Sequence, residues 1–223
     1  MSTATLPPAV EPFTLADLVE RFGPLPFSRI RSTPPPGLAT EADFLATADT
    51  VKPLCELIDG VMVEKAMGHL ESWLAGWITT LLNNFVVPRG LGRVLSSDGP
   101  IRLQAGQIRI PDSSFISQER LRGCDLSQSI LPVAPNLAVE ILSVSNTRRE
   151  MSRKLTEYFD AGVELVWFLE PRHRVVQVFS SPTASTELRT GQMLTGGVVL
   201  PGFVVTVDEL FAPLDRELPK THE

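Results

Sequence analysis

The feature that most constrains the fold is a carboxylate inside an unbroken apolar run. Residues 136–142 read Asn-Leu-Ala-Val-Glu-Ile-Leu, and the strand-forming residues do not alternate with polar ones. Such a run is typical of a strand that is covered on both faces. Burying Glu140 there is costly unless the carboxylate is paired, hydrogen-bonded or bound to a cation. The sequence therefore predicts a sheet with a charged group in its interior, and metal coordination is a leading explanation.

Hydrophobic periodicity predicts helices and strands around this run. Apolar residues recur at helical spacing over 70–85, and a second helix over 148–161 begins with a capping box at Thr147 and Glu150. Asp-Gly at 59–60 predicts a hairpin turn between strands 55–58 and 61–65. This mixture predicts an α/β sheet domain. Further strands are predicted at 93–97, 101–104, 108–110, 112–117, 165–169, 175–179, 198–200 and 203–207, with short helical segments near 14–22, 40–45 and 208–211.

The organisation predicted from the sequence has three parts. Residues 1–38 are rich in proline, which removes backbone donors, so we expect an extended N-terminal arm that either packs on a partner subunit or stays mobile. Residues 39–212 form the folded domain, and residues 213–223 form a polar C-terminal tail.

Composition excludes some classes of protein and leaves others open. No apolar run approaches the roughly 18 residues needed to span a bilayer, and the N-terminus does not read as a signal peptide. Cys55 and Cys124 lie far apart and belong to no metal or redox pair, which favours a cytoplasmic protein with free thiols. The net charge of −6 argues against wholesale attachment to nucleic acid, but it allows a local basic groove.

Five short motifs occur in a fixed order and together resemble a known family. They are Glu-Leu-Ile-Asp-Gly at 56–60, Arg-Ile-Pro-Asp at 109–112, Val-Glu-Ile-Leu-Ser-Val-Ser at 139–145, Arg-Lys-Leu at 153–155 with Tyr158 and Ala-Gly-Val at 161–163, and Leu-Pro-Gly-Phe at 200–203. The set is similar to the Uma-type family of restriction endonucleases in the PD-(D/E)xK nuclease superfamily, and it covers roughly residues 39–212.

The resemblance implies a fold, an activity and a set of site residues. The fold is a restriction-endonuclease-like mixed sheet flanked by helices, and the activity is Mg²⁺-dependent cleavage of DNA, with Mn²⁺ as a substitute. Glu56, Asp112 and Glu140 match the acidic positions that hold the metal, and Lys154 matches a catalytic lysine on the following helix. The superfamily's common lysine position holds Leu142 instead. The family also suggests a homodimer.

The residues themselves support this chemistry and leave a structural explanation open for each. Mg²⁺ prefers carboxylate and water oxygens, and a neighbouring ammonium group can stabilise charge on an attacked phosphate. Lys154 borders the apolar stripe of its helix, so its stem can cross the core and aim its charge at the sheet. Alternatively, Asp112 is a turn residue, Glu140 forms a structural salt bridge with Lys154 or an arginine, Glu56 points outward on its hairpin, and Lys154 is a solvated edge charge.

Other polar residues are candidates for supporting roles. His69 stands at the start of the long helix and is a candidate accessory residue, although a cap or surface role is the alternative. Arginines at the metal site or on the second helix are candidates for a phosphate-binding groove, with surface solvation as the alternative. Trp73 and Trp77 are expected in the core. The candidate arginines are Arg109, Arg148, Arg149 and Arg153, together with Arg102.

Two functions from different classes follow. The first is a Mg²⁺-dependent endonuclease that hydrolyses DNA phosphodiester bonds. The second is a catalytically inactive module that keeps the nuclease fold and binds DNA or protein. Leu142 at the lysine position, Val144 where a proline is often seen, and the acidic net charge motivate the second.

Overall fold

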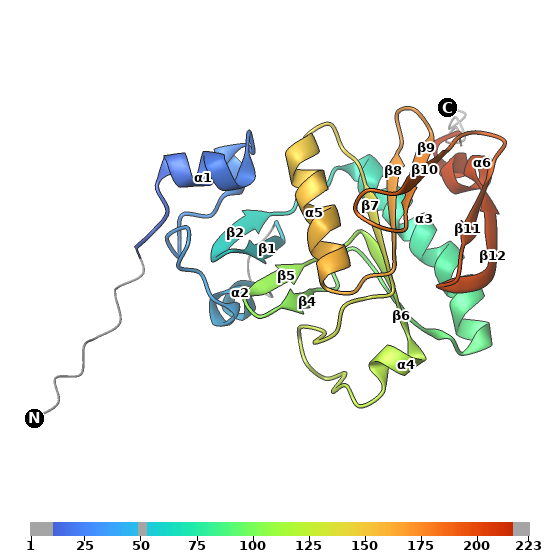
Figure 1. Ribbon diagram of the computed structural model, residues 1–223, viewed down its shortest axis with the longest axis horizontal. Coiled ribbons are helices and arrows are strands. Elements are labelled where there is room, and N and C mark those ends of the chain that lie inside the picture. Colours follow the sequence, from blue (N-terminus) through green and yellow to red (C-terminus); the bar gives the residue numbers. More distant parts are fainter. Residues whose placement is uncertain (1–10, 49–52, 216–223) are drawn as a thin grey trace, which may run out of the picture.

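The computed structural model describes residues 11–48 and 53–215. Within them the chain is a mixed α/β protein built on one six-stranded and one four-stranded sheet, with a separate β-hairpin (Figure 1). The helices are α1 (Leu15–Phe22), α2 (Glu41–Ala48), α3 (His69–Val86), α4 (Gln118–Leu121), α5 (Arg148–Asp160) and α6 (Val207–Phe211), with 3₁₀ turns at Phe27–Arg29, Val87–Arg89 and Ala212–Asp215. The strands are β1 (Cys55–Ile58), β2 (Val61–Glu64), β3 (Gly92–Leu95), β4 (Ile101–Gln104), β5 (Gln107–Arg109), β6 (Ser113–Ser117), β7 (Leu137–Ile141), β8 (Leu165–Glu170), β9 (Val175–Phe179), β10 (Ser185–Leu188), β11 (Met193–Gly196) and β12 (Leu200–Thr206).

The larger sheet has the strand order β10-β9-β8-β7-β6-β3. β7 pairs with β6 in antiparallel fashion and with β8 in parallel, so the sheet is mixed. Parallel neighbours need a crossover connection, and α5 supplies it between β7 and β8. The predicted fold class, a mixed sheet flanked by helices, is confirmed.

Helices cover both faces of the larger sheet, and β7 shows how its side chains divide between them. Leu137, Val139 and Ile141 belong to a core with α3, α6 and the β11–β12 hairpin. Ala138 belongs to a second core with α5. Because successive side chains of a strand point to opposite faces, Glu140 also faces α5. The prediction of a strand buried on both faces is confirmed, since every residue of β7 is buried.

The smaller sheet, in the order β2-β1-β5-β4, carries Glu56. The predicted β1–β2 hairpin is confirmed, with Asp59 at φ 49° and Gly60 at φ 73° in its turn. Positive φ at both turn positions matches the twist of the flanking strands, and it explains the Asp-Gly pair. β1 pairs with β5, which brings Glu56 beside the segment that leads to Asp112.

The C-terminal part of the chain and the long helix differ from the prediction in three places. The strand predicted at 198–200 is wrong, because Val198 is 90% exposed in a turn and β12 begins at Leu200. β10 and β11 were missed, since both expose side chains and show weak hydrophobic patterning. The expectation that Trp73 lies in the core is wrong as well, because its side chain is 44% exposed.

The described part of the N-terminal arm packs on its own chain. Thr14 and Asp17 form a capping box that starts α1. Phe22, together with Leu18 and Leu25, then buries its side chain against the β1–β2 hairpin at Ile58, Val61 and Val63. Residues 1–10 and 216–223 lie outside the described residues, and the division of the chain at residues 38 and 212 stays a prediction.

Replacing Phe22 by Ala tests how firmly the arm is held. Phe22 is 6% exposed, and the loss of a buried aromatic ring typically costs about 3–5 kcal/mol. We expect a lower midpoint of urea unfolding for Phe22→Ala. Leu15→Ala on the same helix is the control, because Leu15 is 67% exposed. Equal midpoints for the two variants would contradict a stabilising role for this contact.

Candidate active site

Asp112 and Glu140 meet across the β6–β7 pair. The register joins Ser113 to Val139, so the next residues along, Asp112 and Glu140, also lie opposite each other. The backbone N–H of Asp112 donates to the Val139 carbonyl at 3.0 Å. The Asp112 carboxylate in turn accepts from the backbone N–H of Ile141 at 2.7 Å. These bonds fix Asp112 beside the strand that carries Glu140.

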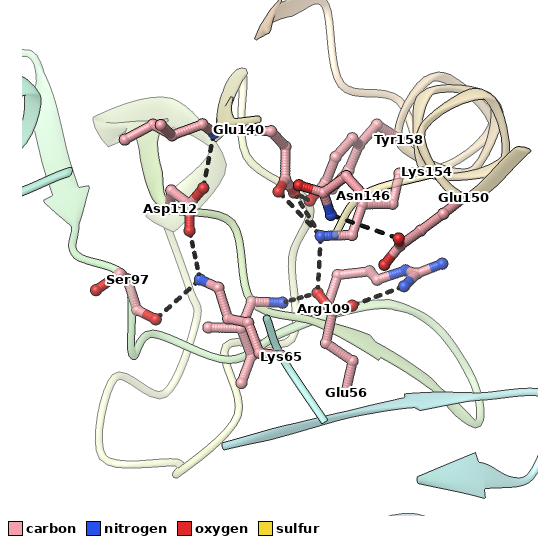
Figure 2. A network of polar contacts seen from close by, with 12 residues as sticks. Glu56, Lys65, Ser97, Arg109, Asp112, Glu140, Asn146, Glu150, Lys154 and Tyr158 are labelled. Atoms are coloured by element: carbon pink, nitrogen blue, oxygen red, sulfur yellow. Dashed lines mark hydrogen bonds and ion pairs between the residues drawn. The ribbon is translucent and has the colours of Figure 1, made fainter. Parts of the chain in front are cut away.

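Glu140 points from β7 toward α5, where it meets two polar side chains (Figure 2). Lys154 Nζ lies 3.0 Å from Glu140 Oε1 and 2.9 Å from Oε2. The Tyr158 hydroxyl donates to Oε1 of the same carboxylate. Residues four apart on a helix share a face, which explains why both reach one acceptor. The predicted reach of Lys154 toward the sheet is confirmed.

Glu56 joins the same group from the smaller sheet. Its Oε1 atom lies 3.3 Å from Lys154 Nζ and accepts from the backbone N–H of Ile110 at 3.0 Å. Its Oε2 atom accepts from Arg109 Nη1 at 2.7 Å. Lys154 therefore bridges Glu56 and Glu140. Glu56, Asp112, Glu140 and Lys154 are each 4% exposed or less, and the structure brings the four predicted catalytic residues together.

The protonation of these groups is set by burial and by their neighbours. Burial raises the pKa of Glu140, and the charge of Lys154 only partly opposes this. Burial also acts to raise the pKa of Glu56, but the charges of Lys154 and Arg109 outweigh it and lower that pKa to about 2. The two glutamates keep the pKa of Lys154 above its usual value despite its burial. Burial raises the pKa of Tyr158 well above normal, so its hydroxyl stays a donor.

Lys65 is a member of this group that the sequence analysis missed. It follows β2, and its Nζ atom lies 2.8 Å from Asp112 Oδ1 and 3.0 Å from the Ser97 carbonyl oxygen (Figure 2). The hydrogen bond from Tyr158 to Glu140 was not predicted either. The sequence does contain one indication of Lys65: lysine is rare in this chain and occurs only at 52, 65, 154 and 220.

The arginines predicted to bind phosphate are placed differently from one another. Arg109 is 2% exposed and pairs with Glu56 and Glu157. Arg153 pairs with Glu157 and Asp59. The phosphate-binding role of both stays a prediction, and in the structure both serve ion pairs within the protein.

The remaining candidates lie nearer to solvent. Arg148 is exposed at the first position of α5. Arg149 is exposed as well, and its guanidinium donates to the Glu20 carbonyl of the arm. His69 is exposed at the start of α3, with its ring 6.3 Å from that of Trp73. Within the described ranges, no hydrogen bond or ion pair joins His69 to the buried charges. Arg102 pairs with Glu41 outside the group.

The donor set at this place fits Mg²⁺ in its chemistry. Asp112 and Glu140 offer carboxylates from opposite positions of the β6–β7 register, and Mg²⁺ usually binds through one or two carboxylates and several waters. In the part of the chain that the structure describes, however, no three His, Cys, Asp or Glu side chains converge closely enough to hold an ion by themselves. Each carboxylate is instead paired with a cation, Glu56 with Arg109 and Lys154, Asp112 with Lys65, and Glu140 with Lys154.

Comparison with known proteins identifies relatives by sequence and by fold. The sequence model of the Uma2 family, described as "Putative restriction endonuclease", matches residues 42–208. A similar crystal structure is that of a protein from Anabaena variabilis ATCC 29413, described as "a putative nuclease belonging to DUF820". The two share 18% sequence identity and a TM-score of 0.68 over 78% of this chain and 97% of that one, which supports a common fold. No curated protein matches the chain. Across the described helices, none is long and apolar enough to cross a membrane.

Proposed function

The chain belongs to the Uma2 family, and from this premise we propose that it is a nuclease that cleaves DNA internally and depends on Mg²⁺, with Mn²⁺ able to replace it. The observation that carries the proposal is the pair of carboxylates, Asp112 just before β6 and Glu140 on the neighbouring β7, with Glu56 and Lys154 beside them. Acidic side chains at neighbouring strand positions are the donors that Mg²⁺ needs to bind a phosphate substrate.

Each residue has a stated part in the proposal. Asp112 and Glu140 would hold the ion, and Glu56 would be an accessory ligand. When bound, Mg²⁺ would polarise the phosphoryl oxygen and lower the pKa of a bound water. Asp112 keeps its orientation through the N–H of Ile141, and Lys154 orients Glu56 and Glu140 together. A direct role of Lys154 in the attack of water stays a prediction. We also retain the prediction of a cytoplasmic homodimer, because cutting both strands of DNA suits a symmetric pair.

The second candidate function is a binding module that keeps the fold without turnover. The observation in its favour is that each of the three carboxylates is already paired with a cation. Asp112 pairs with Lys65, Glu56 with Arg109, and Glu140 with Lys154. An ion held by Asp112 or Glu140 would have to compete with these cations. This function predicts that divalent ions have little effect on the thermal unfolding temperature.

The experiment that decides between the two is metal-dependent cleavage of supercoiled plasmid. We expect nicked and linear products with Mg²⁺ or Mn²⁺ and none with EDTA. We expect Asp112→Asn to lose activity by on the order of 100-fold, because it removes a charged oxygen at the place where the ion binds. Arg189→Met is the control for a lost charge elsewhere, since Arg189 is exposed and pairs with Glu187 at the edge of the sheet. Equal activity in wild type and Asp112→Asn would rule out the proposed site.

A further inference from the structure

Lys65 lies at one end of the buried charge group, beside the 96–100 connection. This group comprises Glu56, Lys65, Arg109, Asp112, Glu140 and Lys154. The side chain of Lys65 is 6% exposed and that of Lys154 is 5% exposed, so both ammonium groups are buried. Ser97, whose carbonyl Lys65 contacts, is partly exposed, and the next residue, Asp98, is exposed. The backbone N–H of Lys65 donates to the Leu54 carbonyl at 2.7 Å, which fixes the main chain from which the side chain projects. Lys65 is therefore the lysine of this group that contacts the 96–100 connection, whereas Lys154 contacts Glu56 and Glu140.

The two lysines differ in how many of their donors are already used. Lys154 Nζ contacts three carboxylate oxygens, from Glu140 and Glu56. Lys65 Nζ contacts Asp112 Oδ1 and the carbonyl of Ser97. An ammonium group has three N–H donors. Among the described residues, Lys65 thus keeps one donor for a further acceptor, and Lys154 has none to spare.

The choice of lysine at this position is informative in this chain. Arginine makes the other close ion pairs described here, such as Arg29 with Glu150 and Arg102 with Glu41. Both lysines in the described ranges lie in the buried charge group, together with Arg109. A lysine carries a compact charge on a flexible stem with rotatable donors, whereas arginine presents a rigid planar fork. An ammonium group that turns from Asp112 toward an arriving phosphate needs the flexible stem and the rotatable donors of lysine.

We propose that Lys65 is a catalytic residue whose ammonium group contacts a non-bridging oxygen of the phosphate that is hydrolysed, while Lys154 holds Glu56 and Glu140 in place. This proposal rests on the nuclease function proposed above and names the residue that binds its substrate. A preorganised charge at the attacked phosphate stabilises the negative charge that develops there. Asp112, which accepts from Lys65 through Oδ1, positions the ammonium group and would also be available to hold the ion.

The test separates binding from cleavage. Lys65→Gln removes the charge but keeps a donor for Asp112, and Lys65→Met is a second neutral variant in case the first does not fold. With EDTA present, we measure the affinity for a labelled DNA duplex by fluorescence anisotropy at several salt concentrations. Loss of one phosphate contact should lower the slope of log affinity against log salt by about 1. With Mg²⁺ and saturating DNA, cleavage should fall on the order of 100-fold.

Two further variants serve as controls for the charge of Lys65. Lys65→Arg should restore the salt slope, because it restores the charge, and Arg189→Met should leave both slope and rate as in wild type. A neutral Lys65 variant that folds and shows the wild-type slope and rate overturns the proposal. A lower rate with the wild-type slope also overturns it, because Lys65 then acts only through Asp112. If wild type does not cleave with either ion, the proposed function fails and so does the catalytic role, and the slope alone reports whether Lys65 touches a phosphate.

Discussion

Replacing Lys154 by Met is expected to lower the free energy of unfolding by about 3–5 kcal/mol, because the change leaves two buried carboxylates without their shared cation. Lys154 is the group that bridges Glu56 and Glu140, with Nζ–O distances of 3.3 Å and 2.9 Å. Both carboxylates are nearly inaccessible to water. Water therefore cannot replace the lost partner.

Urea unfolding followed by circular dichroism measures this loss. Lys65→Met is the matched control, because it removes the other buried lysine while the Asp112 carboxylate keeps its bond from the Ile141 N–H. We expect the control to cost less. Lys154→Arg should recover part of the stability, since it restores the charge without matching the ammonium geometry. A Lys154→Met protein as stable as wild type would show that the bridge contributes little to folding.

Replacing Glu140 by Gln is expected to separate activity from stability. The variant loses one anionic ligand of the proposed ion, so cleavage should fall on the order of 100-fold and metal binding should weaken. The fold should tolerate the change. Burial raises the pKa of Glu140, so the neutral side chain is the form that the folded protein already favours relative to the unfolded one. The amide oxygen still accepts from Tyr158, and Lys154 keeps Glu56.

The raised pKa of Glu140 sets the direction in which the stability of the folded protein changes with pH. A carboxyl group with a raised pKa in the folded state contributes stability below its unfolded value of 4.5, and this contribution is lost as pH rises through the folded value. We expect Glu140→Gln to lack that part of the pH profile of the unfolding temperature. Isothermal titration calorimetry measures the binding of Mg²⁺ to the variant, and the plasmid assay measures its cleavage of DNA. If Glu140→Gln cleaves DNA like wild type, Glu140 is not part of the proposed site, whatever the stability of the variant.

The sequence was most informative where local pattern and function coincide. The apolar run around Glu140 predicted a strand buried on both faces, and the capping box at Thr147 placed α5 correctly. With these two elements placed, the reach of Lys154 toward Glu140 followed from helix geometry. The convergence of Glu56 and Asp112 on the same place was available only through the resemblance to the family, since nothing local connects a hairpin residue to a distant strand.

Features that depend on distant contacts were beyond the sequence. Lys65 and Asp112 are far apart in the chain, and only the packing of the smaller sheet against β6 and β7 brings them within 2.8 Å. The docking of Phe22 on the β1–β2 hairpin is a contact of the same kind. Trp73 follows the helical apolar period of α3, yet none of the described elements covers it enough to bury its side chain. Periodicity shows which residues share a face, but it does not show what packs on that face.

The β6–β7 register has a consequence for which changes of chain length the protein tolerates. Side chains alternate between the two faces of a strand, so deleting one residue from the first part of β7 would turn Glu140 away from Lys154 and into the apolar layer beneath α3. A deletion in the exposed residues 125–129, between α4 and β7, would leave that pairing intact. Variation in length should accordingly concentrate in this connection and be rare inside the two strands.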